Sequence, residues 1–231
     1  MSHRIGIIAA LSGELKPLVS DWSPQPDGAF LTQRGDVALI AVAKGIGIVR
    51  AEQAVSIAET YGSLNALVSI GWAGGASCGV QPGTAYEVSE VIDPASGERY
   101  ATSAVTSPIK LVTLDHVAGR EEKRQVAESY GASLVDMEAV AVARLARVRG
   151  LPFYCWKAVT DTAAEDLPDF NYFLDQEKQL RTRQVAAYAL THPRYVAPLL
   201  RMGRNSKSGA EALGHALRRW ISEGRYADSN G

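Results

Sequence analysis

Short apolar runs that alternate with amphipathic segments constrain the fold of this chain more than any other feature. The runs "RIGIIAAL" (4–11), "NALVSIGWAGGAS" (65–77) and "LPFYCWKAVTD" (151–161) are mostly apolar, as expected of strands that are buried on both faces of a sheet. The second of them is expected to run into a glycine-rich turn. The segments 48–62 and 120–131 carry apolar residues at helical spacing and predict helices between the strands. This alternation predicts an α/β domain.

The remaining elements follow from periodicity and from glycine and proline stops. Strands are predicted at 35–45, 84–93 and 109–117. Helices are predicted from Met137 or Glu138 to Gly150, at 171–190, and as a C-terminal pair separated near 203–208. No repeat, low-complexity tract or long linker interrupts the chain. We therefore expect one α/β domain over 1–203, followed by a helical extension and polar tail over 204–231.

Composition excludes several classes of function. The chain has 24 basic and 25 acidic side chains, so no basic excess is available to neutralise nucleic-acid phosphates. No apolar run reaches membrane-spanning length, and the first residues lack a signal-peptide layout. Cys78 and Cys155 form no CxxC or disulfide framework, which favours reduced thiols in a cytoplasmic protein. The four histidines form no metal-ligand pattern, so no metal is expected.

Glycine and carboxylate residues recur after the predicted strands. Ligands of α/β sheets bind beyond the carboxyl ends of the strands, where this chain places Glu14, "KGIG" (44–47), "GWAGG" (71–75) and Asp161. Glycine-rich turns let backbone N–H groups approach a ligand closely. The sequence "GIGIVRA" also resembles a dinucleotide-binding fingerprint, but Arg50 occupies its last glycine position. A turn that leads into a helix is the favoured interpretation, and a nicotinamide-dependent oxidoreductase is disfavoured.

Each carboxylate at this edge also has a purely structural interpretation. Glu14 and Glu138 fall in the first turns of predicted helices, where the helix dipole favours an acid. Asp136 is placed to cap the helix that follows it. Asp161, at the end of an apolar strand, is either a cap or a functional group. Taken singly, the structural interpretation is favoured; taken together, the four acids indicate a site.

Several motifs resemble one enzyme family. The segments "IGIIAALSGEL", "KGIGIVRA", "SIGWAGGA", "VDMEAVAVARLA" and "PFYCWKAVTDTAAED" resemble the nucleoside phosphorylase and nucleosidase superfamily. The chain looks closest to the 5′-methylthioadenosine/S-adenosylhomocysteine nucleosidases and to phosphorylase-like proteins associated with hopanoid synthesis. The resemblance covers about residues 4–190. It implies a single three-layer α/β domain with a mixed, partly closed central sheet flanked by helices, and a homo-oligomer, with a dimer favoured.

The resemblance also implies roles for individual residues. Glu14 would activate the attacking water, and Asp161 would protonate N7 of a purine leaving group. Met137 would pack under the ribose, and Glu138 would bind its hydroxyls. The remaining substrate-binding positions would be Gly71, Trp72, Ala73 and Gly74 along the sugar or phosphate, Val117 and Ala118 in the base pocket, and Phe170 stacked near the base. Lys44 and Arg50, with Arg120, are candidates for an anion site, since inorganic phosphate is an optional co-substrate; no other cofactor is implied.

Three departures from the family pattern leave alternatives open. Trp72 stands where a serine is common, Lys157 where an arginine is common, and Thr160 where a serine is usual. The loss of the serine hydroxyl weakens the case for phosphate, so we expect hydrolysis of the N-glycosidic bond of a nucleoside, with a purine base favoured. Phosphorolysis and a non-catalytic nucleoside-binding module are the alternatives. A 5′-substituted adenosine, an adenosyl-lipid precursor and a plain purine nucleoside stay open as substrates.

Overall fold

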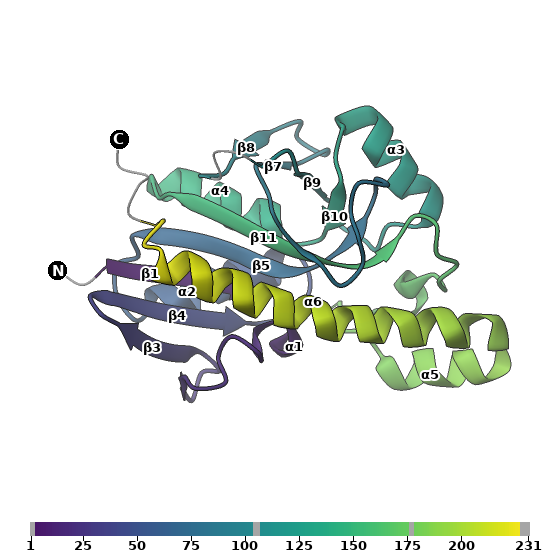
Figure 1. The fold of residues 1–231 in the computed structure, drawn as a ribbon, viewed down its shortest axis with the longest axis horizontal. Helices are drawn as coiled ribbons and strands as arrows, with labels where there is room; N and C mark the ends of the chain where they lie inside the picture. Colours follow the sequence, from purple (N-terminus) through teal and green to yellow (C-terminus); the bar gives the residue numbers. More distant parts are fainter. Residues whose placement is uncertain (1–2, 104–106, 176–177, 227–231) are drawn as a thin grey trace.

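The predicted apolar runs form the centre of a mixed sheet in the computed structural model, which describes residues 3–103, 107–175 and 178–226 (Figure 1). Strand β1 (His3–Ala9) pairs in parallel with β4 (Val37–Ala43) and with β5 (Ala66–Gly75). Strand β11 (Phe153–Thr162) pairs in parallel with β5 along almost its whole length. These four strands are the middle of an α/β domain, as predicted.

The sheet branches at β5 instead of closing. The first half of β5 pairs with β1, and after β1 ends, Gly74 and Gly75 pair with β10 on an antiparallel register. Because β11 also pairs with β5, this strand has three partners, and the pairings among the described residues leave the sheet open. The predicted partial closure is therefore corrected to an open, branched sheet. The other strands are β2 (Ser23–Pro24), β3 (Phe30–Arg34), β6 (Ala85–Glu87), β7 (Glu90–Ile92), β8 (Arg99–Ala101), β9 (Lys110–Thr113) and β10 (Leu134–Asp136).

Helices cover both faces of the sheet and complete three layers. Helices α2 (Ile48–Glu59) and α4 (Ala139–Arg149) pack against one face, and α1 (Ser12–Leu15) and α6 (Val196–Ser222) against the other. Figure 1 shows α6 lying across the front of the sheet with α2 behind it. Successive residues of one strand point to opposite faces of the sheet. Ile8 packs in the hydrophobic core beneath α2 and α4, and Ile7 packs in the core beneath α1 and α6. This two-sided burial explains why the central strands are apolar on both faces.

Helix α6 contradicts the predicted C-terminal pair of helices, because it runs without a break through 203–208. Its second half packs against β11, and a Cβ on Gly209 would lie 2.8 Å from the Cβ of Ala158. Gly209, just beyond the predicted break, therefore allows a close approach of the helix to the strand, whereas a Cβ on Gly203 would meet nothing within 4 Å. The packing of the second half of α6 outweighs the low helix propensity of glycine. The predicted domain boundary between residues 203 and 204 falls inside α6.

Three further predicted elements differ from the structure. The segment 71–75 is the last part of a strand and not a turn, and the segment 84–93 is divided between two short strands. Within 171–190, the 3-10 turn η1 (Phe170–Phe173) precedes a loop, and helix α5 begins only at Thr182 and ends at Thr191. Helix α3 (Arg120–Tyr130) agrees with its prediction. None of the helices among the described residues is long and apolar enough to cross a membrane.

Candidate active site

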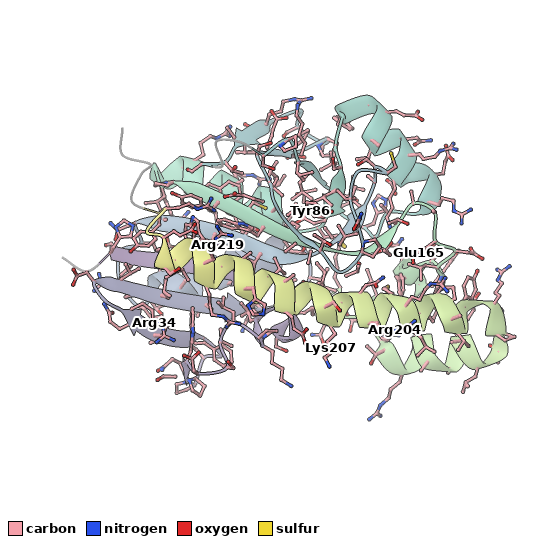
Figure 2. All side chains as sticks on the ribbon, in the orientation of Figure 1. Arg34, Tyr86, Glu165, Arg204, Lys207 and Arg219 are labelled. Atoms are coloured by element: carbon pink, nitrogen blue, oxygen red, sulfur yellow. The ribbon has the colours of Figure 1, made fainter. Side chains whose placement is uncertain are left out.

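A cavity of about 700 Å³ lies at the carboxyl ends of the central strands. Its walls come from the ends of β5, β10 and β11, from the start of α3, and from the segment after β11 that contains Glu165, labelled in Figure 2. Met202 and Ser206 of α6 also line it. The position agrees with the rule that α/β sheets bind ligands beyond the carboxyl ends of their strands.

The cavity collects most of the residues that the sequence singles out. Gly71, Lys44 and Arg50 are not among its lining residues, whereas Arg120 is. Lys44 is exposed, and Arg50 donates to Gln53 in the next turn of α2. The predicted residues that do line the cavity are Glu14, Trp72, Ala73, Gly74, Val117, Ala118, Met137, Glu138, Asp161 and Phe170.

Glu14 is buried and held by three backbone donors. Its Oε2 accepts from the N–H groups of Ala10 and Leu11 at 2.9 and 2.8 Å, and its Oε1 accepts from Trp72 N–H at 2.8 Å. Burial raises the pKa of Glu14, although these donors and the charge of Lys157 oppose the rise. The arrangement fixes the carboxylate at the cavity wall.

Gly71 explains how Glu14 fits there. Its φ of +152° lies at the edge of the region that side chains rarely adopt, and a Cβ would lie 2.9 Å from Glu14 Oε1. The first glycine of "GWAGG" therefore makes room for a carboxylate of the protein itself.

Glu138 is the residue before α4, close to the start that was predicted for this helix. Its Oε1 accepts from Gly47 N–H at 2.7 Å, so the predicted "KGIG" turn holds this carboxyl group. Burial raises its pKa to about 8, and the charges of Asp136 and Glu14 add to the effect. Near neutral pH the protonated form is therefore well populated, and the group can donate as well as accept hydrogen bonds.

Asp136 and Lys157 form a buried ion pair next to Glu138. Lys157 Nζ lies 2.8 Å from Asp136 Oδ2, and the two side chains are 1% and 0% exposed. Asp136 also accepts from Thr113 Oγ1 at 2.6 Å and from Ala139 N–H at 3.0 Å. Burial opposes the charge on Lys157, yet Asp136 raises the lysine pKa above its usual value. The prediction that Asp136 is the N-cap of this helix is wrong, because α4 begins at Ala139 and Glu138 is the residue at its N-cap. Asp136 still accepts from the first N–H of the helix, and it compensates a buried lysine.

Asp161 pairs with a residue that sequence reasoning missed. Lys123 Nζ donates to Asp161 Oδ2, both residues are buried, and both line the cavity. Asp161 Oδ1 accepts from Thr160 Oγ1 at 2.7 Å, so the hydroxyl that replaces the usual serine is used. One signal for Lys123 was available: it lies in the first turn of α3, the end where the helix dipole disfavours a cation.

Trp72 is a wall of the cavity and a link to α6. Its indole Nε1 donates to the carbonyl of Ser206 at 3.0 Å, and its ring packs against Gly13, where a Cβ would lie 3.1 Å from Cη2. The residue that departs from the family pattern therefore ties α1, β5 and α6 together. A serine could not make these contacts, because its hydroxyl is too short to reach across.

His116 is a second lining residue that the sequence did not single out. Its ring lies between two carboxylates, with Nδ1 2.6 Å from Asp115 and Nε2 2.8 Å from Glu122. The hydrogen bond to Asp115 is the main reason why the pKa of His116 is raised, with a smaller contribution from Glu122. No group of three or more His, Cys, Asp or Glu suited to a metal ion was found within the part of the chain that the structure describes.

A family model described as the phosphorylase superfamily matches residues 109–191. This range contains Asp136, Glu138 and Asp161. The resemblance to the phosphorylase superfamily is confirmed. A search of curated proteins, in contrast, found no match for this sequence.

Solved structures with the same fold include several nucleosidases. A Helicobacter pylori 5′-methylthioadenosine nucleosidase variant with 5′-methylthioadenosine in its active site is 14% identical, with a TM-score of 0.73 over 96% of this chain and 100% of the other. Futalosine hydrolase from Helicobacter pylori is 16% identical, with a TM-score of 0.73 over 96% and 99%. The 5′-methylthioadenosine nucleosidase of Arabidopsis thaliana is 17% identical, with a TM-score of 0.73 over 99% and 97%. At these identities the likeness shows a shared fold.

Proposed function

We propose that this protein cleaves the N-glycosidic bond of a nucleoside in this cavity, with water as the nucleophile and a purine as the favoured base. The observation that carries the proposal is that one cavity holds two sets of acid–base groups. Glu14 and Glu138 form one set, and Asp161 with Lys123 forms the other. Similarity in fold to nucleosidases and a futalosine hydrolase supports the same reaction class.

The two sets suit the two difficulties of the reaction. Breaking the bond leaves positive charge on the sugar, which the carboxylate of Glu14 stabilises electrostatically. In the proposal, Glu138 binds the ribose hydroxyls above Met137, and Glu14 takes a proton from the attacking water. A purine leaves poorly as an anion, so Asp161 hands a proton to it; general acid catalysis of this kind contributes about 10²–10⁴-fold.

Two contacts favour water over phosphate as the nucleophile. The backbone N–H of Trp72, in the glycine-rich segment, already donates to Glu14 and is not free to bind an anion. Arg120, the one predicted anion-site candidate that lines the cavity, donates to the carbonyl of Ala164 at 2.9 Å. Lys44 and Arg50 stay predictions for an anion site elsewhere.

Product analysis tests the proposal. The purified protein is incubated with adenosine and with 5′-methylthioadenosine, with and without inorganic phosphate, and the free base and the sugar are identified by chromatography. We expect adenine and the free sugar at a rate that does not depend on phosphate. A sugar 1-phosphate that forms only with phosphate would replace hydrolysis by phosphorolysis. Tight binding without turnover would favour a binding module, an alternative that is consistent with the full pairing of Glu14 and Asp161 by the protein's own groups.

We also propose a homodimer in the cytoplasm as the working form. The low cysteine content supports the location. Sedimentation velocity tests the assembly, for which a purely monomeric species at micromolar concentration would be the contrary result.

A further inference from the structure

Lys123 is a buried cation at the base of the cavity. It is 5% exposed, although it belongs to a helix whose neighbouring residues Glu121 and Arg124 are exposed. Its side chain crosses Gly74, where a Cβ would lie 2.7 Å from Lys123 Cε and 2.9 Å from Nζ. A side chain at position 74 would therefore displace the ammonium group. The absence of a side chain at Gly74 therefore allows Lys123 to extend from α3 to Asp161.

Both carboxyl oxygens of Asp161 contact hydrogen-bond donors of the protein. Lys123 donates to Oδ2 and the Thr160 hydroxyl donates to Oδ1. A proton that Asp161 hands to a leaving base must therefore be replaced by a group in contact with the carboxyl group. Lys123 is the nearest one, and it carries three N–H donors.

Lys123 lies where a cation depends on a carboxylate partner. It is buried, and a cation in the first turn of a helix faces the positive end of the helix dipole. Asp161 compensates this charge through their hydrogen bond. Negative charge that develops on a base beside Asp161 would draw a proton along this contact, from Lys123 through the carboxylate.

We propose that Lys123 is the source of the proton that the leaving base takes, and that Asp161 passes it on. The inference rests on the proposed function. As the C–N bond breaks, its electron pair moves to the base, a base nitrogen takes a proton from Asp161, and Asp161 takes one from Lys123. Lys123 changes from ammonium to amine and Asp161 returns to carboxylate. Water adds to the sugar carbon and Glu14 accepts its proton. Exchange with solvent then removes the proton from Glu14 and returns one to Lys123.

A leaving-group series tests Lys123. Three variants are compared with the parent: Lys123→Met, which keeps the length of the side chain, Lys123→Arg, which keeps the charge but holds its proton too tightly to release it, and Arg124→Met as the control on the exposed side of the same helix. Each is assayed with purine ribosides whose 6-substituents make the base a better or poorer leaving group. Thermal unfolding confirms that each variant is folded.

We expect both Lys123 variants to lose about 10²–10⁴-fold in kcat with the poorest leaving base and much less with the best one, while Arg124→Met matches the parent. An equal loss across the series, full activity in Lys123→Met, or full activity in Lys123→Arg would each overturn the proton-source role. Such results, with an active parent, leave the proposed function standing. A parent that cleaves none of the ribosides would overturn both.

Discussion

Removal of the Lys157 ammonium group is expected to destabilise the fold strongly, because it leaves the buried carboxylate of Asp136 without its positive partner. Lys157→Met keeps a side chain of similar length, so the main effect is the loss of the ammonium group and not a cavity. Asp136, whose side chain is 0% exposed, would keep only the Thr113 hydroxyl and the Ala139 N–H as donors. Removing one partner of a buried ion pair typically costs about 3–5 kcal/mol. For a chain of this size that corresponds to a fall in Tm of about 6–20 °C.

Urea unfolding of three variants measures this effect. Lys110→Met is the control, because Lys110 lies 3.4 Å from Glu90 with 41% of its side chain exposed, and such a pair contributes at most about 1 kcal/mol. The double variant Lys157→Met with Asp136→Asn also removes the unpaired carboxylate charge. It should regain part of the free energy of unfolding that Lys157→Met loses. The reasoning is refuted if Lys157→Met is no more destabilising than Lys110→Met, or if the two changes at the buried pair are additive.

Three further predictions concern the cavity. Gly71→Ala should lower stability by about 1–3 kcal/mol through backbone strain and displace Glu14, so both unfolding and turnover are measured; parent-like values in both would contradict the contact. Trp72→Phe should lose about 1 kcal/mol from the hydrogen bond to Ser206, whereas an unchanged free energy of unfolding would argue against it. The pKa of Glu138 is raised from 4.5 to about 8 in the folded protein, so the folded state binds more protons than the unfolded state between these values. Stability of the parent relative to Glu138→Gln should therefore fall as pH rises from about 4.5 to 8, and a constant difference in unfolding free energy over this range would contradict the burial of this group.

The central strands were predictable because strands that are buried on both faces have continuous apolar sequences. Runs such as 4–11 and 151–161 are apolar on both faces, and helices pack on both faces of the sheet. The branching at β5 has no such signal in the sequence. It arises where β5 stops pairing with β1 and, at Gly74 and Gly75, pairs with β10. Local periodicity does not indicate which distant segments will pair.

The glycine-rich segment and α6 show why propensity alone misled. Glycine has low strand and helix propensity, so the sequence predicts a turn at 71–75 and a break at 203–208. In the structure Gly71 and Gly74 lie close to Glu14 and Lys123, and Gly209, just beyond the predicted break, lies close to Ala158. Tertiary contacts of this kind decide the conformation and cannot be read from neighbours in the chain.

The candidate site was predictable where a motif carried it. Glu14, Glu138 and Asp161 came from the family resemblance, and the structure places all three at one cavity. Lys123 was missed because it lies in a polar helix, where lysine is unremarkable. His116 was missed because one of its two carboxylate partners, Glu122, belongs to the helix that follows. Only the position of Lys123 at the wrong end of a helix dipole indicated that it has a partner.

The most direct test of the account is the rate at which a purine nucleoside releases its base in phosphate-free buffer. The measurement compares the parent with Asp161→Asn, which removes the carboxyl group that pairs with Lys123 in the cavity wall. We predict steady release by the parent and a loss of about 10²–10⁴-fold in the variant. No release by the parent, or equal rates in the two proteins, would contradict the account.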